Sequence, residues 1–115
     1  MSYTKAMNQP ETQTLQELVQ RIQKASTPLR VLLFGSGAKG VMGAQSDLDV
    51  LVVVPEGTHK RKTAQDIHRK LVGFRTPVDV IVATPDILEK HKDTVGLIYK
   101  TALAQGREIY AAAKA

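Results

Sequence analysis

Hydrophobic residues recur along this chain at two spacings, and each spacing predicts a different kind of element. Between residues 11 and 24 the apolar side chains stand three or four positions apart, which predicts an amphipathic helix with one apolar stripe. Residues 31–34 and 50–54 are instead short runs of apolar side chains, which favour buried strands. A similar run at residues 77–83 predicts a third strand and contains one charged residue, Asp79.

Helical spacing returns twice in the second half of the chain. Residues 58–73 predict a second helix whose apolar face takes in Ile67, His68 and Val72, with basic side chains largely on the opposite face. A third helix is expected over residues 86–105, followed by a short edge strand over residues 107–110. Residues 1–10 and 111–115 show neither spacing, so we expect them to be flexible.

The order of these elements predicts one small domain of the α/β or α+β class. A chain of 115 residues is long enough for one hydrophobic core and too short for two ordinary domains. We therefore expect residues 1–115 to form a single domain, in which helices flank a small mixed β-sheet of three to four strands.

Composition narrows the classes of protein to which the chain can belong. The absence of cysteine excludes disulfides and thiolate metal sites, and neither a membrane-spanning run nor a signal-peptide pattern is present, so we expect a cytoplasmic protein without a membrane partner. The net charge of +5 permits an acidic partner. Aromatic residues make up only 4%, and the basic run at residues 60–62 is interpreted as a solvated helix end, so we do not expect direct nucleic-acid binding.

A glycine-rich segment follows the first predicted strand and allows two interpretations. Gly35-x-Gly37-x-x-Gly40 has the spacing of a dinucleotide-binding fingerprint, and Glu56 stands about 20 residues on, where an acid that binds ribose is expected. That fingerprint requires a parallel crossover of about 10 to 12 residues or more. Only residues 41–46 separate Gly40 from Asp47, which argues against NAD binding. The sequence of a Walker A loop is absent.

Three aspartates favour the second interpretation, a divalent metal site. Asp47 and Asp49 stand two positions apart, so on a strand they face the same side, about 6.6 Å apart along the chain. If residues 77–83 pair beside this strand, Asp79 adds a third carboxylate to the same patch. A divalent cation is the ordinary way to offset the repulsion between such carboxylates. The structural alternatives are a turn at the start of a strand for Asp47 and Asp49, and a solvated strand start for Asp79.

The glycine segment supplies groups that could bind phosphate beside such a metal. Gly35 allows the backbone to approach a triphosphate closely, and a short helix that begins near Ser36 would direct N–H groups toward it. The Ser36 hydroxyl adds a donor, although Ser36 could also be a simple helix N-cap. Lys39 could add positive charge.

The combination of these motifs resembles the DNA polymerase β-like nucleotidyltransferase superfamily. Gly35-Ser36, then ten residues, then Asp47-x-Asp49, with Asp79 on a later strand, is similar to its motif pattern, and the short chain resembles its minimal nucleotidyltransferase (MNT) branch. The resemblance implies the polymerase β-like fold and two Mg²⁺ ions bound by Asp47, Asp49 and Asp79 as the catalytic residues. It also implies ATP as the substrate, bound with the help of Gly35, Ser36 and Lys39. Relatives often carry arginines in this loop, where this chain has Gly37 and Lys39.

The resemblance also implies a partner. Small stand-alone members often act as the antitoxin of a HEPN-domain ribonuclease toxin, and some transfer AMP from ATP to a tyrosine of that toxin. Two alternatives remain: an antitoxin that neutralises its partner by binding alone, and a nucleotidyltransferase that modifies a small molecule such as an aminoglycoside. The sequence leaves open whether the chain forms a homo-oligomer.

Overall fold

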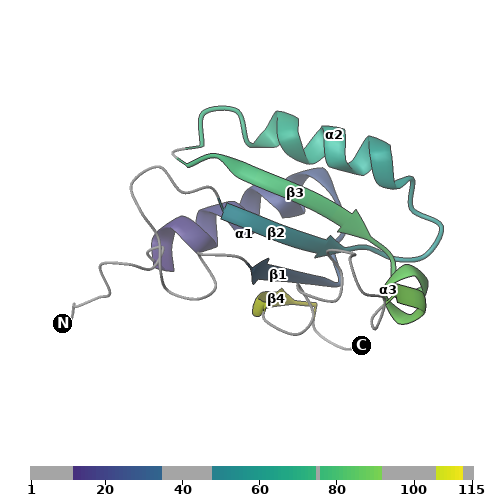
Figure 1. Ribbon diagram of the computed structural model, residues 1–115. Coiled ribbons are helices and arrows are strands. Elements are labelled where there is room, and N and C mark those ends of the chain that lie inside the picture. The colour runs from purple at the N-terminus through teal and green to yellow at the C-terminus, as the bar shows by residue number, and fades with distance from the viewer. Residues whose placement is uncertain (1–11, 35–47, 75, 92–105, 113–115) are drawn as a thin grey trace.

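The computed structural model of this chain describes residues 12–34, 48–74, 76–91 and 106–112. They form, in chain order, α1 (Thr12–Ala25), β1 (Arg30–Phe34), β2 (Leu48–Val53), α2 (Lys60–Lys70), β3 (Val78–Ala83), α3 (Pro85–His91) and β4 (Arg107–Ala111). Figure 1 shows these strands side by side in one sheet, with α1 behind it, α2 along β3, and α3 just beyond the end of β3.

The sheet is mixed, and its strand order is β3-β2-β1-β4. β1 pairs antiparallel with both β2 and β4, whereas β2 and β3 pair in parallel. The parallel pair is joined through α2, as a crossover connection requires. Since β1 and β2 are antiparallel, they are not the βαβ unit that a dinucleotide-binding fingerprint needs, and the predicted small mixed sheet is confirmed.

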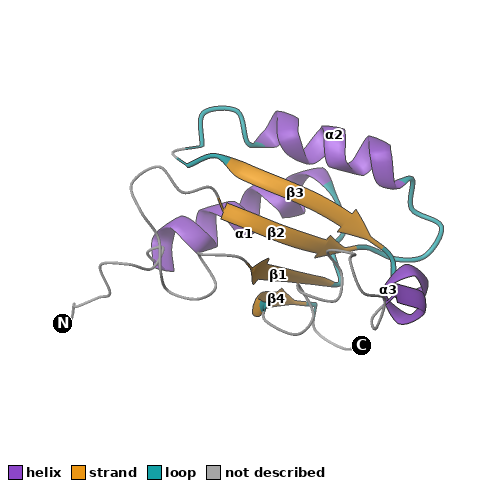
Figure 2. Cartoon of the chain, in the orientation of Figure 1, coloured by secondary structure: helices purple, strands orange, loops and turns teal. Residues whose placement is uncertain are grey.

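The larger part of the core lies between the sheet and the two longer helices. α1 packs against α2, and the two cover one face of the sheet together, as Figure 2 allows the reader to follow. Their apolar stripes, spaced three and four residues apart, meet alternate residues of the two inner strands. The buried residues of this cluster are Leu15, Leu18, Ile22, Val31, Leu33, Leu48, Val50, Val52, Val54, Ile67 and Val82.

A smaller cluster lies on the opposite face, where α3 packs. It is formed by Leu32, Phe34, Leu51, Val53, Ala83 and Leu88. Because side chains alternate along a strand, Asp49 and Asp79 belong to this second face, each one step from a residue of the larger cluster. No helix in the described ranges has the length and apolar character needed to cross a membrane.

The helix predicted over residues 58–73 is shorter in the structure. α2 ends at Lys70 with Leu71 as its C-cap, and Gly73 adopts a φ of +84°, a left-handed conformation in which glycine carries no steric penalty. The predicted apolar face was therefore wrong at two positions, since Val72 is 78% exposed and His68 is also exposed. Of the helix predicted over residues 86–105, the structure describes α3, and residues 92–105 lie outside the described ranges.

Candidate functional site

Asp49 and Asp79 are register partners across the parallel pair β2 and β3. Neighbouring strands lie about 4.8 Å apart, so the two side chains leave the same face of the sheet side by side. Asp49 is partly buried and Asp79 is exposed. The structure thus places β3 beside the strand of Asp49, which is the condition under which the sequence predicted that Asp79 would join the patch.

The hydrogen bonds at both ends of the parallel pair keep the two aspartates in register. The Leu48 N–H donates to the Pro77 carbonyl at 2.9 Å, and the Val54 N–H donates to the Ala83 carbonyl at 2.9 Å. Leu48 and Val50, on either side of Asp49, are fully buried on the opposite face. A slip of one residue would exchange the two faces of β3 and place apolar Val78 or Val80 beside Asp49, so burial specifies this register.

β1 ends beside Asp49. Phe34, the last residue of β1, is the register partner of Asp49 on the side away from β3 and is 4% exposed. Gly35 and Ser36 therefore follow, in the sequence, a strand end that lies directly beside Asp49. Gly35, Ser36, Lys39 and Asp47 themselves lie outside the described residues.

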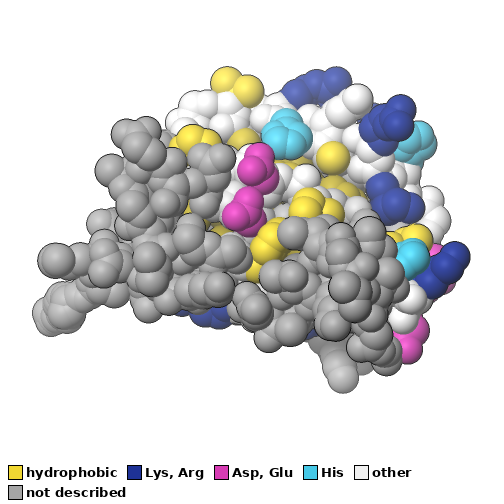
Figure 3. All heavy atoms as spheres, in the orientation of Figure 1, with side chains coloured by type: hydrophobic (Ala, Val, Ile, Leu, Met, Phe, Trp, Pro, Cys, Tyr) yellow, Lys and Arg dark blue, Asp and Glu magenta, His cyan; other side chains and the backbone are white. Residues whose placement is uncertain are grey.

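Charge is distributed unevenly over the described surface. Figure 3 shows acidic side chains gathered over β2 and β3, with hydrophobic side chains next to them, and basic side chains along α2. Two carboxylates on neighbouring strands repel one another unless a cation or a proton lies between them. Within the described ranges, no group of three or more His, Cys, Asp or Glu side chains is placed to hold a metal ion. Asp49 and Asp79 make up the described part of the predicted set of three.

Beyond the end of β3, the first turn of α3 contains an acidic residue, Asp86, to which the sequence pattern assigned no role. Thr84 follows β3, is buried, and accepts a hydrogen bond from the Leu88 N–H at 3.1 Å through its carbonyl, as an N-cap of α3 does. The Thr84 hydroxyl donates to the Asp86 carboxylate and lowers its pKa below the ordinary 3.8; nearby backbone N–H groups and the charge of Lys60 act in the same direction. The sequence signal was Thr84 followed by Pro85, a cap and a first helical residue.

A second cap was also missed, at the start of α2. The Nδ1 atom of His59 accepts a hydrogen bond from the Lys62 N–H at 3.2 Å, so this exposed histidine is the N-cap of α2. Histidine is not among the preferred N-cap residues, so its residue type did not predict a cap at this position.

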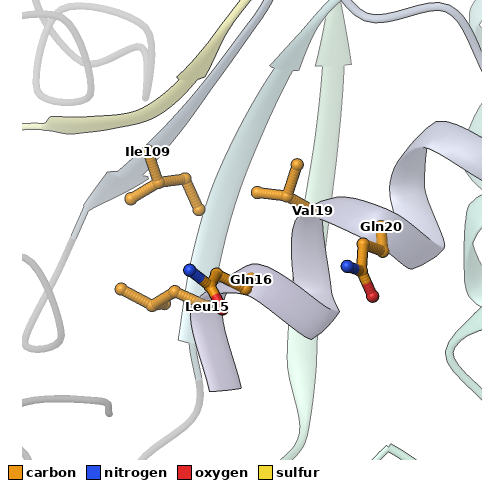
Figure 4. Close-up of a pocket in the computed structure, with 5 residues that line it drawn as sticks. All are labelled: Leu15, Gln16, Val19, Gln20 and Ile109. Atoms are coloured by element: carbon orange, nitrogen blue, oxygen red, sulfur yellow. The ribbon is translucent and has the colours of Figure 1, made fainter. Parts of the chain in front are cut away.

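Two hollows in the described surface lie away from the aspartates. One, of about 410 Å³, lies between α1 and β4 and is lined by Leu15, Gln16, Val19, Gln20 and Ile109; Figure 4 shows these side chains around it. The other, of about 370 Å³, is lined by Lys24, Ala25, Asp66, Arg69 and Lys70. Both involve α1, which covers the face opposite Asp49 and Asp79, so neither hollow is part of the acidic site.

The model of one known protein family matches most of the chain. Residues 13–107 match the model of a family described as "Nucleotidyltransferase domain". The match runs from α1 to the first residue of β4 and includes Gly35, Ser36 and the three aspartates. No curated protein matches the chain at a significant level.

Solved structures share the fold. A protein of Sulfolobus solfataricus assigned as a nucleotidyltransferase is 23% identical over 87% of this chain and 79% of its own, with a TM-score of 0.56. A chain of the tri-AMPylated Shewanella oneidensis HEPN toxin in complex with MNT antitoxin is 12% identical over 89% of this chain and 74% of its own, with a TM-score of 0.59. A chain of a toxin–antitoxin complex with AMP-PNP is 16% identical, covering 85% and 73%, with a TM-score of 0.58.

Proposed function

The chain belongs to the nucleotidyltransferase domain family, and from this premise we propose that it transfers AMP from ATP to a hydroxyl of a partner protein. Members of the family generally use a nucleoside triphosphate and a divalent metal ion. The observation that carries the proposal is the register of Asp49 with Asp79, beside the end of β1 that leads to Gly35 and Ser36.

The donor chemistry of these residues fits Mg²⁺. Magnesium prefers carboxylate and water oxygens, and it is commonly held by one or two carboxylates together with substrate phosphates. Asp49 and Asp79 present carboxylates on one face of the sheet, and Asp47, two positions before Asp49, is the proposed third ligand. When bound there, the metal would neutralise charge on the triphosphate oxygens.

The residues of the chain then have separate tasks in the proposed transfer. The acceptor oxygen attacks the α-phosphorus of ATP, the bond from that phosphorus to the oxygen bridging to the β-phosphorus breaks, and pyrophosphate leaves with the bonding electrons. Asp79, the more exposed of the two described carboxylates, accepts the proton from the acceptor hydroxyl or orients it. Backbone N–H groups at Gly35 and Ser36, together with Lys39, bind the phosphates.

A HEPN-domain toxin is the proposed partner, with a tyrosine hydroxyl as the acceptor. Support comes from the fold, which this chain shares with chains of toxin–antitoxin complexes, one of which contains a tri-AMPylated HEPN toxin with an MNT antitoxin. Inhibition of the toxin by binding alone, and transfer to a small hydroxyl compound, are the competing functions.

The test is transfer of label from α-³²P-ATP, with Mg²⁺, to the protein encoded by the neighbouring gene. We expect the wild-type chain to label a tyrosine of that protein, and Asp47→Asn/Asp49→Asn to lower the rate by about a hundredfold or more, because the metal ligands are lost. Glu56→Gln is the matched control, since Glu56 is an exposed acid in the turn after β2 and should leave the rate unchanged.

Two results would contradict the proposal. Labelling that persists in the double aspartate variant would mean that transfer does not depend on these carboxylates. If the label appears on an aminoglycoside and not on the protein, the acceptor is a small molecule and not a partner protein.

A further inference from the structure

Arg21 of α1 contacts the end of α2 in two ways and is itself held by a residue of its own helix. Its Nη1 atom donates to the Lys70 carbonyl at 3.1 Å and to the Val72 carbonyl at 2.9 Å. Its Cζ atom lies 5.4 Å from the centroid of the Phe74 ring. Its Nε and Nη2 atoms contact the same oxygen of Glu17, one helical turn earlier, at 3.0 and 2.8 Å.

These contacts match what the end of a helix requires. The last carbonyls of an α-helix have no partner within the helix, and the helix dipole places partial negative charge there. The Phe74 N–H donates to the Leu71 carbonyl at 2.9 Å, one residue beyond Lys70, so the chain has already turned out of the helix. The guanidinium of Arg21 supplies N–H donors and positive charge to this turn, and Glu17 orients it.

The turn bound by Arg21 precedes, along the chain, the strand that carries Asp79. Asp79 is five positions after Phe74, and β3 lies at the edge of the described sheet, paired with β2 only. The start of β3 is joined to β2 by the Leu48 to Pro77 hydrogen bond. Phe74 in turn packs against the core cluster on the α1 face, so the position of the turn is tied to α1 on one side and to β3 on the other.

We propose that Arg21 is a positioning residue for Asp79: by holding the turn after α2, it fixes the start of β3 and so keeps Asp79 beside Asp49. The proposal rests on the function proposed above, since it gives Arg21 a part in that site although Arg21 lies on a helix packed against the opposite face. It acts through the backbone and touches neither nucleotide nor metal.

Arg21→Met is the principal variant, because it keeps an unbranched apolar side chain while removing the guanidinium. Arg21→Lys keeps the charge but not the planar fork that reaches two carbonyls while it stacks on Phe74. Arg69→Met is the matched control: it makes the same change near the end of α2, where Arg69 pairs with Asp66 at 2.7 Å.

The first measurement is amide hydrogen exchange of the full chain. In Arg21→Met the Leu48 amide should exchange about tenfold faster, while amides in the pairing of β1 with β4 change much less. The second is Mn²⁺ affinity, measured by the broadening of the Asp49 and Asp79 amide signals. We expect it to fall about fivefold in Arg21→Met, to fall less in Arg21→Lys, and to be unchanged in Arg69→Met.

Uniform acceleration of exchange, or faster exchange at Leu48 with Mn²⁺ affinity unchanged, would overturn the proposal and leave Arg21 with a role in stability only. Should Arg21→Met fail to fold, the same comparison is made with Arg21→Lys. A wild-type chain that binds no Mn²⁺ at Asp49 would contradict the metal site of the proposed function instead. In that case exchange at Leu48 still decides whether Arg21 holds the start of β3.

Discussion

Asp49 and Asp79 differ in how strongly their surroundings hold them. Asp49 lies in an inner strand between two fully buried residues, so its backbone moves only if the core moves. Asp79 is exposed and is the second residue of β3, which among the described strands pairs only with β2. Substitution of Asp79 should therefore change chemistry at the site while disturbing the core little.

Asp79→Asn tests the role of this carboxylate in proton transfer and metal binding. We expect kcat to fall about a hundredfold or more, the range of a lost general base, with the free energy of unfolding changed by less than about 0.5 kcal/mol. Steady-state transfer kinetics and urea denaturation measure the two quantities. Full activity in this variant would mean that Asp79 has no part in the reaction. Asp79 would then be only a solvated residue near the start of a strand.

Thr84→Val tests the hydrogen bond that lowers the pKa of Asp86. The variant keeps the shape of the side chain but loses the hydroxyl, so the pKa of Asp86 should rise toward 3.8, which a carboxyl NMR titration measures. A carboxyl with a lowered pKa stabilises the folded state above its unfolded pKa, and that stabilisation is lost as the pH falls through the folded value. As the pH falls below 3.8, the variant should therefore lose less stability than the wild-type chain loses. An unchanged titration of the Asp86 carboxyl would contradict the assigned cause.

At the scale of elements, the end of α2 shows how local geometry overrides periodicity. The spacing of apolar residues continued to Val72, but the chain turns at Leu71 and Gly73, which exposes the Val72 side chain. The carbonyls left over at this turn are bound by Arg21 from another helix. Apolar spacing along one segment contains no information about a donor supplied by α1.

Gly73→Ala should destabilise the protein by about 1 kcal/mol, because a residue with a Cβ is strained at a φ of +84°. A Cβ at this position meets no atom within 4 Å, so the cost is conformational rather than a clash. Val72→Ala, next to it and exposed, should change the free energy of unfolding by less than about 0.5 kcal/mol. Urea denaturation of both variants provides the comparison, and equal stabilities would contradict it.

At the scale of the molecule, the two faces of the sheet have different coverings. α1 and α2 bury one face under a large apolar cluster, while α3 covers part of the other and the acidic residues lie on the same side. The arrangement is the fold shared with the nucleotidyltransferase structures. It separates the elements that stabilise the domain from the face that carries the candidate site.

The stoichiometry of toxin neutralisation distinguishes catalysis from binding alone. If the chain modifies its partner, a sub-stoichiometric amount should suppress the ribonuclease activity fully, and only with ATP and Mg²⁺ present. If it acts by covering the partner, about one equivalent should be needed and neither addition should matter. Asp47→Asn/Asp49→Asn is the control, because this variant should still inhibit the toxin by binding but should no longer inhibit it by modification.

Much of the architecture followed from the apolar pattern. The predicted helix at residues 11–24 corresponds to α1, and the runs at residues 31–34, 50–54 and 77–83 correspond to three strands with shifts of one or two residues at their ends. The predicted edge strand at residues 107–110 became β4, next to β1. The ends of the elements differ from the predicted ones because they depend on caps and turns, as at His59 and Gly73.

The candidate site was predicted from spacing, and part of it from resemblance. The separation of Asp47 from Asp49 implies a shared face only if both lie on a strand, and the structure places Asp49 inside β2. The roles assigned to Gly35, Ser36, Lys39 and Asp47 remain predictions, because these positions lie outside the described residues. The family match, which covers all four, supports the resemblance that implies the same roles.

The sequence by itself determined which segments form helices and strands and which positions carry carboxylates. Apolar periodicity depends only on residues that are close together in the chain, and residue type belongs to a single position. Tertiary structure alone decided that β2 and β3 are parallel and that Asp79 stands opposite Asp49. It also decided that an arginine of α1 binds the turn before β3. Residues 30 positions apart come into register only when the sheet buries its faces as a whole, and no local pattern specifies that outcome.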